Sequence, residues 1–392
     1  MATDNLRHSV YGLFNDSFPP VLDGVTLAVQ NYVRWLTAAG KPVTVITPWN
    51  PETPPHEDFE LHRYFSLPIY NRYPYRYGYP KLDPFIWRHL RRTPFRIIHA
   101  HCPFSSGHLG LYAARYHDIP FVTTFHSKYR TDLERSLPRM MVEYQMRKLL
   151  RFYNAATEVW IPQAAVEETL REYGFKGRVT VVENGNDLAD GIEDLPSYKA
   201  EARKSLGLRD DEIGLLFVGQ HILEKGLKII IEALALLSNM PFRMNFIGTG
   251  YAAGDMKRLA ESLHLEDRVT FHGVITDRET LRRYYAASDL FLFPSFYDNA
   301  PLVVREAAAM GTPSILLTGS TAAEMITDGE NGFLTSRTPT DYAALISAIA
   351  ADRAALDRAG KGARATLCRS WQNVVGEVIN RYDEIIDRYG RK

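Results

Sequence analysis

The chain has 392 residues, of which 45% are hydrophobic and 23% are charged, and its formal net charge is zero. This is the composition of an ordinary globular protein, and the length predicts two domains or one large one, because single cores rarely grow past about 250–300 residues. No apolar run approaches the roughly 18–20 residues that span a bilayer, and we expect no nucleic acid partner. Two cysteines, Cys102 and Cys368, are too few and too far apart for a disulfide framework or a zinc site. The opening residues, MATDNLRHS, lack a signal pattern, so we expect a cytoplasmic protein.

Apolar runs of strand length alternate with helix-length segments along the first half of the chain. The pattern predicts a helix that ends at Gly40 and another near 105–117. It predicts strands at 9–15, 43–47, 96–100, 121–125, 159–162 and 179–183.

Two residues of this half follow predicted strands. Gly24, in the DGV that follows FPPVL, lets the backbone approach a phosphate closely and begins a helix; the alternative is a plain strand-to-helix turn. His126 follows the strand FVTTF, at the carboxyl edge of the predicted sheet. A histidine at that edge is either structural or part of a reacting site.

Residues 70–96 form a basic and aromatic stretch, with seven Lys or Arg, one Asp and eight aromatic residues. Basic residues interleaved with Tyr and Trp can lie on an anionic membrane surface or hold an anionic acceptor. The alternative is a solvated loop whose tyrosines fold back onto the domain. Four prolines interrupt the stretch and argue against a long amphipathic helix.

The second half repeats the rhythm of the first. Its predicted strands cover 214–219, 244–248, 269–273, 289–295 and 314–318, with helices between them. Near-continuous apolar strands separated by crossover helices predict two doubly wound α/β domains with parallel sheets. We expect an N-terminal domain at 1–190, a second domain at 191–370, and a final helix at 371–392 that packs back on the first. Ligands of such sheets bind beyond the carboxyl ends of the strands, so both domains are expected to face one cleft.

Lys225 follows the strand GLLFVG within GQHILEKG and is predicted to open the next helix. It is either a solvated lysine or a cation that neutralises a diphosphate at the strand ends. Further along, GTGYAAG (248–254) looks like a dinucleotide fingerprint. Its spacing is GxGxxxG, however, and the following strand, VTFHG, lacks the expected acidic residue.

The segment YDNAPLVVREAAAMGTPSIL (297–316) places polar residues between a strand and a buried helix. Pro301 suits the first turn of that helix, because its missing N–H costs nothing there. The backbone N–H groups of Leu302 and Val303 then point out of the helix N-terminus, where the helix dipole favours anions. Glu306 lies one turn further in, and its side chain leans toward the N-terminus, within reach of a diol. This segment therefore predicts a site for a phosphate and a sugar.

Several other classes of site are not indicated. A GxSxG nucleophile elbow is missing, and no HExxH motif or ligand cluster suggests a metal.

Taken together, these motifs resemble the retaining, nucleotide-sugar-dependent glycosyltransferases of family four. The likeness covers nearly the whole chain, and implies the GT-B architecture of two Rossmann-like domains. It rests on FPPVLDGV, HAHCPFSSGHLG, IPFVTTFHS, VGQHILEKGL, FIGTG, the 297–316 segment and AAEMITDGENGFL, in that order.

The resemblance implies a role for each matching position. The family's two acids with seven residues between them fall on Asp298 and Glu306: the first holds hydroxyls of the donor sugar, and the second holds the ribose. His126 lies beside the sugar. We therefore expect His126 and Asp298 to be the catalytic residues. The expected donor-binding residues are Gly24, Gln220, Lys225, Asn299, Ala300, Leu302, Val303 and Glu306.

Two positions depart from the family pattern. Gln220 stands where the family has an arginine, so one of two cationic phosphate contacts is missing unless Arg305 or His221 replaces it. Such a charged contact is worth roughly 1.5–3 kcal/mol. Asp298 is one methylene shorter than the family's glutamate.

The resemblance implies transfer of a hexose-type sugar from a nucleoside-diphosphate sugar to a hydroxyl of a lipid or glycan acceptor. It implies retention of configuration and no cofactor or metal. The stretch 70–96 adds an expected contact with an anionic membrane surface. Alternatives are a nucleotide-sugar epimerase or phosphorylase of the same architecture, and, because of Gln220, a non-catalytic sugar-nucleotide-binding subunit.

Overall fold

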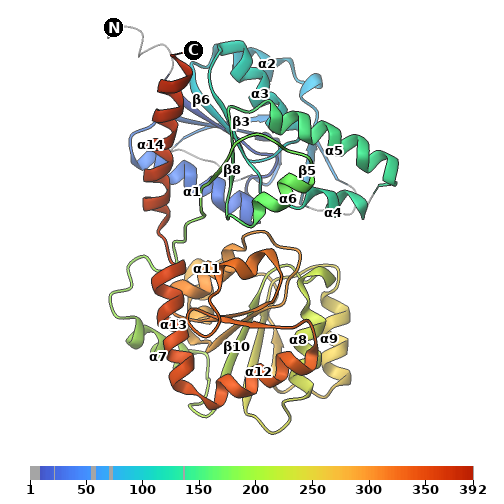
Figure 1. The fold of residues 1–392 in the computed structure, drawn as a ribbon, viewed down its shortest axis with the longest axis vertical. Coiled ribbons are helices and arrows are strands. Elements are labelled where there is room, and N and C mark those ends of the chain that lie inside the picture. Colours follow the sequence, from blue (N-terminus) through green and yellow to red (C-terminus); the bar gives the residue numbers. More distant parts are fainter. Residues whose placement is uncertain (1–8, 22, 54–58, 70–73, 136, 392) are drawn as a thin grey trace. The chain divides into compact units, whose positions relative to one another are not determined.

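The chain folds as two compact units, which a computed structural model describes for residues 9–21, 23–53, 59–69, 74–135 and 137–391. The first unit takes in residues 1–184 and 371–392, and the second takes in residues 185–370 (Figure 1). Two parts of the chain on which expectations rested, residues 1–8 and the beginning of the basic stretch at 70–73, lie outside the described residues.

The first unit is built on a seven-stranded sheet in the order β3-β2-β1-β6-β7-β8-β9, and every neighbouring pair in it is parallel. A separate antiparallel hairpin pairs β4 with β5. The strands are β1 (Val10–Phe14), β2 (Val43–Pro48), β3 (Glu60–Tyr64), β4 (Ser66–Pro68), β5 (Arg76–Gly78), β6 (Phe95–Ala100), β7 (Phe121–Thr124), β8 (Glu158–Ile161) and β9 (Val179–Val181).

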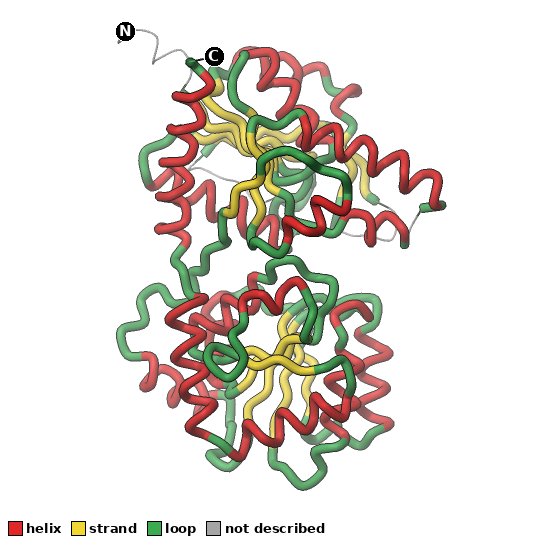
Figure 2. Tube along the Cα trace, in the orientation of Figure 1, coloured by secondary structure: helices red, strands yellow, loops and turns green. Residues whose placement is uncertain are grey.

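Helices cover both faces of this sheet, which Figure 2 shows as the inner layer of strands. The last helix of the chain, α14, packs against α1 and β6 of the same unit (Figure 1). The helices are α1 (Gly24–Ala38), the 3-10 turn η1 (Pro80–Leu82), α2 (Pro84–Arg92), α3 (Ser105–His117), α4 (Tyr129–Glu134), α5 (Arg139–Asn154), α6 (Val166–Glu172) and α14 (Trp371–Tyr389).

The second unit has a six-stranded parallel sheet in the order β12-β11-β10-β13-β14-β15. Its strands are β10 (Ile213–Val218), β11 (Phe242–Ile247), β12 (Val269–Phe271), β13 (Leu290–Phe293), β14 (Ser314–Leu317) and β15 (Phe333–Thr335). Its helices are α7 (Leu195–Ser205), η2 (Leu223–Lys225), α8 (Leu227–Ala235), α9 (Ala253–Ser262), α10 (Arg278–Ala287), α11 (Leu302–Ala309), η3 (Thr321–Met325), α12 (Pro339–Ala351) and α13 (Arg353–Leu367). In Figure 1, α7, α11 and α13 lie on one side of this sheet and α8 and α9 on the other.

The prediction of two doubly wound parallel-sheet domains is confirmed. The central strands β10 and β13 are buried along their whole length, as near-continuous apolar runs predict. Among the described residues, no helix has the length and apolar character that crossing a membrane requires.

The sequence pattern missed the short strands at the edges of the fold. β3 reads ELHRY and is mostly accessible, because it forms an edge of the first sheet and buries little of its length. The hairpin β4–β5 was missed as well: β5 lies among the prolines of the basic and aromatic stretch, and β4 lies just before that stretch. The same prolines shorten the following helix: α2 spans nine residues and begins at Pro84, where a missing N–H costs nothing.

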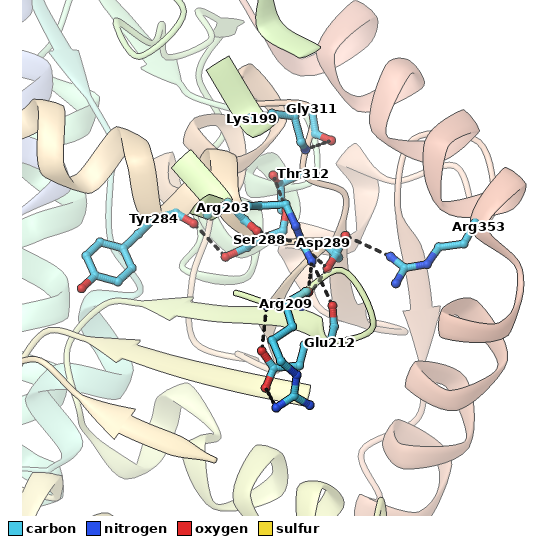
Figure 3. A network of polar contacts seen from close by, with 12 residues as sticks. Lys199, Arg203, Arg209, Glu212, Tyr284, Ser288, Asp289, Gly311, Thr312 and Arg353 are labelled. Carbon is cyan, nitrogen blue, oxygen red and sulfur yellow. Dashed lines mark hydrogen bonds and ion pairs between the residues drawn. The ribbon is translucent and has the colours of Figure 1, made fainter. Parts of the chain in front are cut away.

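A polar network ties the amino-terminal ends of β10 and β13 to the surrounding helices (Figure 3). Asp289, just before β13, accepts hydrogen bonds from Arg203 of α7 at 2.8 Å and from the backbone N–H of Gly214 at 2.7 Å. Arg353 of α13 reaches the other carboxylate oxygen at 3.2 Å. Because ligands bind at the opposite, carboxyl ends of parallel strands, we assign this network to stability.

We expect Asp289→Ala to destabilise the second unit by about 2–3 kcal/mol, because Arg203 and the Gly214 N–H lose their shared acceptor in a largely buried setting. Urea unfolding measures this change. The matched control is Asp255→Ala, whose ion pair with Arg258 is exposed, and it should stay within about 0.5 kcal/mol of the parent. Equal midpoints for Asp289→Ala and the parent would contradict the assignment.

Candidate active site

Lys225 and Asp298, which lie far apart in the sequence, form an ion pair at the carboxyl edge of the second sheet. The Lys225 ammonium lies 2.5 and 2.7 Å from the two carboxylate oxygens of Asp298. Ser295 donates its hydroxyl to the same carboxylate at 2.5 Å. Only 12% of the lysine side chain and 17% of the aspartate side chain are exposed. Two side chains that were predicted to contact the donor, Lys225 and Asp298, therefore lie together in a largely buried position.

A glycine brings the two loops together. Gly226 has a φ of +74°, and a Cβ there would lie 2.4 Å from the carbonyl oxygen of Pro294. The backbone after β10 can therefore approach the end of β13 only through a residue without a side chain. This geometry corrects one expectation: Lys225 does not open helix α8 but ends the 3-10 turn η2, and α8 begins after Gly226.

The N-terminus of α11 lies directly after this ion pair in the chain. The helix begins at Leu302, and Pro301 takes the capping position just before it rather than the first turn. The N–H groups of Leu302 and Val303 belong to the first turn, which has no acceptor within the helix. Asn299 is 4% exposed, whereas Ala300 is partly exposed. The expected anion site is thus built on an eight-residue helix that ends at Ala309, two residues before Gly311, whose φ is positive.

Glu306 is held by two side chains that the sequence did not single out. Its carboxylate accepts hydrogen bonds from the Arg278 guanidinium and from the Tyr285 hydroxyl, each at 2.8 Å. Arg278 also contacts Asp187, so it bridges two carboxylates. The acid keeps accepting capacity, because a carboxylate offers about four lone-pair sites. Burial, together with the nearby Glu306 charge, raises the pKa of Tyr285 well above its ordinary value.

The residues around the two acids were missed for a common reason. Arg278 and Tyr285 come from α10, Asp187 from the loop that opens the second unit, and Ser295 from the loop after β13. Nothing in the spacing of the chain links these positions to Glu306 or Asp298. One signal was available: Ser295 lies three residues before Asp298 in the same loop.

Neither Arg305 nor His221 replaces the arginine that the family has at the position of Gln220. Gln220 is exposed. Arg305 is 2% exposed, and its guanidinium donates to the Leu367 carbonyl at 3.3 Å. The His221 ring is 1% exposed and lies among Phe217, Phe246 and Phe271. Burial also lowers the pKa of His221, so it stays neutral.

The glycines that resemble a dinucleotide fingerprint serve packing. A Cβ on Gly248 would lie 1.9 Å from the Gly219 carbonyl oxygen, and one on Gly250 would lie 2.4 Å from that of His221. The loops after β10 and β11 therefore touch through their backbones. Close backbone contact accounts for both glycines without a cofactor.

In the first unit, Gly24 is the exposed first residue of α1. Asp23 caps this helix, accepting from the N–H of Thr26 at 2.7 Å. Tyr75, from the basic and aromatic stretch, donates its hydroxyl to the same carboxylate at 3.0 Å. Part of that stretch therefore folds back onto the domain, beside the helix start at which a phosphate was predicted.

His126 belongs to a row of three histidines at the carboxyl edge of the first sheet. His101 Nδ1 lies 3.2 Å from His126 Nε2, and His99 lies beside His101 with ring centroids 4.0 Å apart. His99 is bonded on both sides, to the hydroxyls of Tyr382 and Thr124. Burial lowers the pKa of His126 to about 4 and holds the pKa values of His99 and His101 well below the ordinary range.

The contact between His101 and His126 fixes where the protons sit. Both rings are neutral near pH 7, so one nitrogen of the contact donates and the other accepts. Among the described residues, the buried Nε2 of His101 has no hydrogen-bond partner. A buried lone pair without a partner costs less than a buried N–H without one. His101 therefore carries its proton on Nδ1 and donates to His126 Nε2, which places the proton of His126 on Nδ1.

We expect the first unit to lose stability as the pH falls from about 6.5 to 5. The folded pKa values of His99, His101 and His126 lie below the unfolded value, so the unfolded chain binds more protons in this window, and stability rises with pH. The loss should reach at least ~2 kcal/mol, read as a lower melting temperature at pH 5 than at pH 7.5.

Two variants test this pH dependence. His99→Asn should melt lower at pH 7.5 but show a smaller difference between the two pH values. The exposed His264, replaced in His264→Asn, should behave as the parent does. The same melting temperature for the parent at both pH values would contradict the assignment of neutral buried rings.

Family models match both halves of the chain. Residues 22–190 match the model described as Glycosyltransferase Family 4, and residues 198–366 match the model described as Glycosyl transferases group 1. The chain belongs to glycosyltransferase family 4. The predicted family is therefore confirmed.

Curated relatives of this glycosyltransferase include two enzymes of known name. An alpha-monoglucosyldiacylglycerol synthase of Streptococcus pneumoniae is 29% identical over 78% of this chain and 70% of its own. A D-inositol 3-phosphate glycosyltransferase of Xylanimonas cellulosilytica is 28% identical over 75% of this chain and 73% of its own.

Solved structures show the same fold. The Anabaena protein HepE, crystallised with UDP and glucose, superposes with a TM-score of 0.74 over 96% of this chain and 99% of its own, at 18% identity. The structural neighbours are GT-B glycosyltransferases, so the predicted GT-B class is confirmed. The roles of single residues in this glycosyltransferase stay predictions.

Proposed function

We propose that the enzyme transfers a hexose from a nucleoside-diphosphate sugar to a hydroxyl of a membrane lipid, with retention of anomeric configuration. The observation that carries the proposal is the Lys225–Asp298 pair beside the N-terminus of α11. A sugar diphosphate needs a cation and N–H donors for its phosphates and an acceptor for its sugar hydroxyls. This corner of the second unit offers all three.

The ion pair leaves room for a ligand to bind. A lysine ammonium has three N–H donors, and the two contacts with Asp298 leave a third for a phosphate oxygen. The Asp298 carboxylate retains lone pairs for a sugar hydroxyl after its bonds to Lys225 and Ser295. Lys225 Nζ lies 2.7 Å from a carboxylate oxygen of Asp298. A phosphate bound by Lys225 and a sugar bound by Asp298 would therefore lie close enough to be joined by the sugar–phosphate bond of the donor.

In the proposed reaction the acceptor hydroxyl oxygen bonds to the anomeric carbon while the bond from that carbon to the phosphate breaks. The hydroxyl proton passes to the departing phosphate oxygen on the same face of the sugar, which retains the configuration. Lys225 and the N-terminus of α11 stabilise the charge that builds on the leaving diphosphate, and for this reason we propose that no metal is needed. On the family resemblance, we also propose that His126, whose ring contacts His101, is a residue of the donor-sugar site.

Two observations support a lipid acceptor. The name of the Streptococcus pneumoniae relative describes the synthesis of a glucosyl diacylglycerol. In this chain, an exposed apolar patch covers the hairpin β4–β5, η1 and the start of α2. The patch consists of Phe65, Leu67, Tyr77, Tyr79, Leu82 and Phe85, which are 38–78% exposed.

The arrangement of apolar, aromatic and basic side chains in and around the patch suits insertion into a membrane interface. Leu67 and Tyr77 are paired across the hairpin, and the rings of Tyr77 and Tyr79 lie 5.1 Å apart. Beside it, α2 carries exposed arginines that suit anionic head groups, among them Arg88 and Arg92. We therefore propose a peripheral location on the cytoplasmic face of a membrane.

Incubation of the enzyme with UDP-, GDP- and ADP-sugars, each with and without diacylglycerol, tests the proposed function. We expect one donor to release its nucleoside diphosphate in an acceptor-dependent way and to yield an α-linked glycolipid. An epimerised donor, or sugar phosphate formed from a glycan and phosphate, would instead identify an epimerase or a phosphorylase. Thermal stabilisation by a donor without any turnover would identify a binding subunit.

A second acceptor class also has support. Relatives of this chain include D-inositol 3-phosphate glycosyltransferases, whose name describes an anionic polyol acceptor. The basic residues of the stretch 70–96 suit such an acceptor equally well. Product formed with inositol phosphate, but not with diacylglycerol, would favour this class over the lipid.

Replacing Leu82 and Phe85 by serine is expected to reduce binding to anionic vesicles at least tenfold, because these are the most exposed residues of the patch, at 67% and 78%. Sedimentation with vesicles at low salt measures the binding. The control, Leu236→Ser, removes a leucine of similar exposure (57%) from the second unit and should pellet as the parent does. A parent protein that stays in the supernatant would rule out membrane attachment.

A further inference from the structure

A cluster of two histidines and a glutamate lies at an edge of the first sheet, apart from every residue assigned to the donor. Glu60 and His62 stand two apart on strand β3, so their side chains point to the same face. His89 reaches them from α2. One ligand atom from each of the three lies within 4.8 Å of the other two. The two imidazole rings stack with centroids 3.3 Å apart, and His62 Nε2 lies 2.7 Å from the Glu60 carboxylate.

Neighbouring hydroxyl groups orient two members of the cluster. Thr93 donates its hydroxyl proton to the backbone carbonyl of His89 at 3.1 Å. Its oxygen lies 3.1 Å from His89 Nε2 and 3.5 Å from His89 Nδ1, so it accepts from the nearer nitrogen, Nε2. The Nδ1 atom of His89 is then left with a lone pair. Thr44 donates to one oxygen of Glu60 at 2.6 Å, while the other oxygen faces His62. Such outer partners, which fix the tautomer and the direction of a ligand, are typical of metal sites.

We propose that Glu60, His62 and His89 bind one divalent transition-metal ion, of which Zn²⁺ is the best match. Two imidazole nitrogens and one carboxylate oxygen form a ligand set that zinc accepts, with a fourth position for water. The ion joins the edge strand β3 to α2, the helix that begins at the apolar patch. Its role is to stabilise this part of the first unit, and the proposal does not depend on the proposed transferase reaction.

The test is metal binding by the full chain after dialysis against a chelator. Calorimetric titration should find one Zn²⁺ per chain with micromolar or tighter affinity, and Zn²⁺ should raise the melting temperature by several degrees. Co²⁺ in place of Zn²⁺ should give the visible absorption bands of a four-coordinate site. His62→Gln and Glu60→Gln should each lower the Zn²⁺ affinity at least ~10-fold, and Thr93→Val, which leaves all three ligands in place, about 10-fold.

The controls separate this site from adventitious binding. His264→Asn removes an exposed histidine of the second unit and should bind Zn²⁺ as the parent does. Circular dichroism of the variants in chelator should match that of the parent, and Glu60→Gln serves if His62→Gln fails to fold. No saturable binding by the parent, or parent-like affinity in the Glu60→Gln/His62→Gln double variant, would overturn the proposal.

Discussion

Lys225→Ala is expected to lower the affinity for nucleoside diphosphate about 10- to 100-fold, while the affinity for the corresponding nucleoside stays unchanged. The lysine supplies a charged hydrogen bond that only the phosphates can use, and such bonds are worth about 1.5–3 kcal/mol. Turnover should fall further, by about 100- to 1000-fold, because negative charge builds on the leaving diphosphate in the transition state. Calorimetry with both ligands and steady-state kinetics measure the two effects.

The same substitution leaves Asp298 without its cation, so a second comparison is needed. In Lys225→Ala/Asp298→Ala the unpaired carboxylate is gone, and any loss that came only from its repulsion of phosphate should be recovered. Lys228→Ala, three residues along, removes an exposed lysine paired with Glu232 and should leave binding unchanged. Diphosphate affinities in Lys225→Ala equal to those of the parent would remove Lys225 from the donor site.

The sequence predicts the fold well because the central strands of parallel sheets are buried on both faces. Runs such as GLLFV and LFLF can hardly be anything but interior strands, and the helices between them follow from chain crossover. The elements that the sequence did not predict are those that become strands only through tertiary contacts. β3 is a short edge strand of mixed polarity, and it is recognisable as a strand only by its pairing with β2.

The candidate site divides in the same way. Lys225 and Asp298 lie in loops that follow strands and Glu306 lies one turn into a helix, and these positions together with the family resemblance made them candidates. Their partners come from other elements: Arg278 lies 28 residues from Glu306, and the Lys225–Asp298 pair spans 73. Local patterns carry no information about such separations.

Charge pairing explains how this corner can hold two acids without a ligand. Asp298 is neutralised by Lys225, and Glu306 by Arg278, which also contacts Asp187. Each acid is thus fixed in place before the donor arrives, and preorganised groups need little rearrangement when charge develops. Arg278 does not take over the phosphate contact of the missing arginine, because its guanidinium is engaged by the carboxylates of Glu306 and Asp187.

Glu306→Gln is expected to abolish discrimination between a nucleoside diphosphate and its 2′-deoxy form. If Glu306 holds the ribose, the parent should bind the ribonucleotide about 10- to 100-fold more tightly, the worth of a hydrogen bond to a charged group. The amide keeps the size of the side chain but removes its charge, so the ratio should fall close to one. Calorimetric affinities for the two nucleotides give this ratio. The control is Glu232→Gln, which changes a partly exposed glutamate of α8 and should keep the parent's ratio.

Arg278 distinguishes a direct role of Glu306 from a general weakening of the site. Arg278→Lys keeps a cation beside the carboxylate and should retain most of the discrimination, whereas Arg278→Gln leaves Glu306 with Tyr285 as its remaining side-chain contact and should lose part of it. Both variants keep Lys225 and Asp298, so phosphate binding, measured with inorganic pyrophosphate, should not change. The same ratio of affinities in the parent, Glu306→Gln and both Arg278 variants would mean that the ribose does not lie at Glu306.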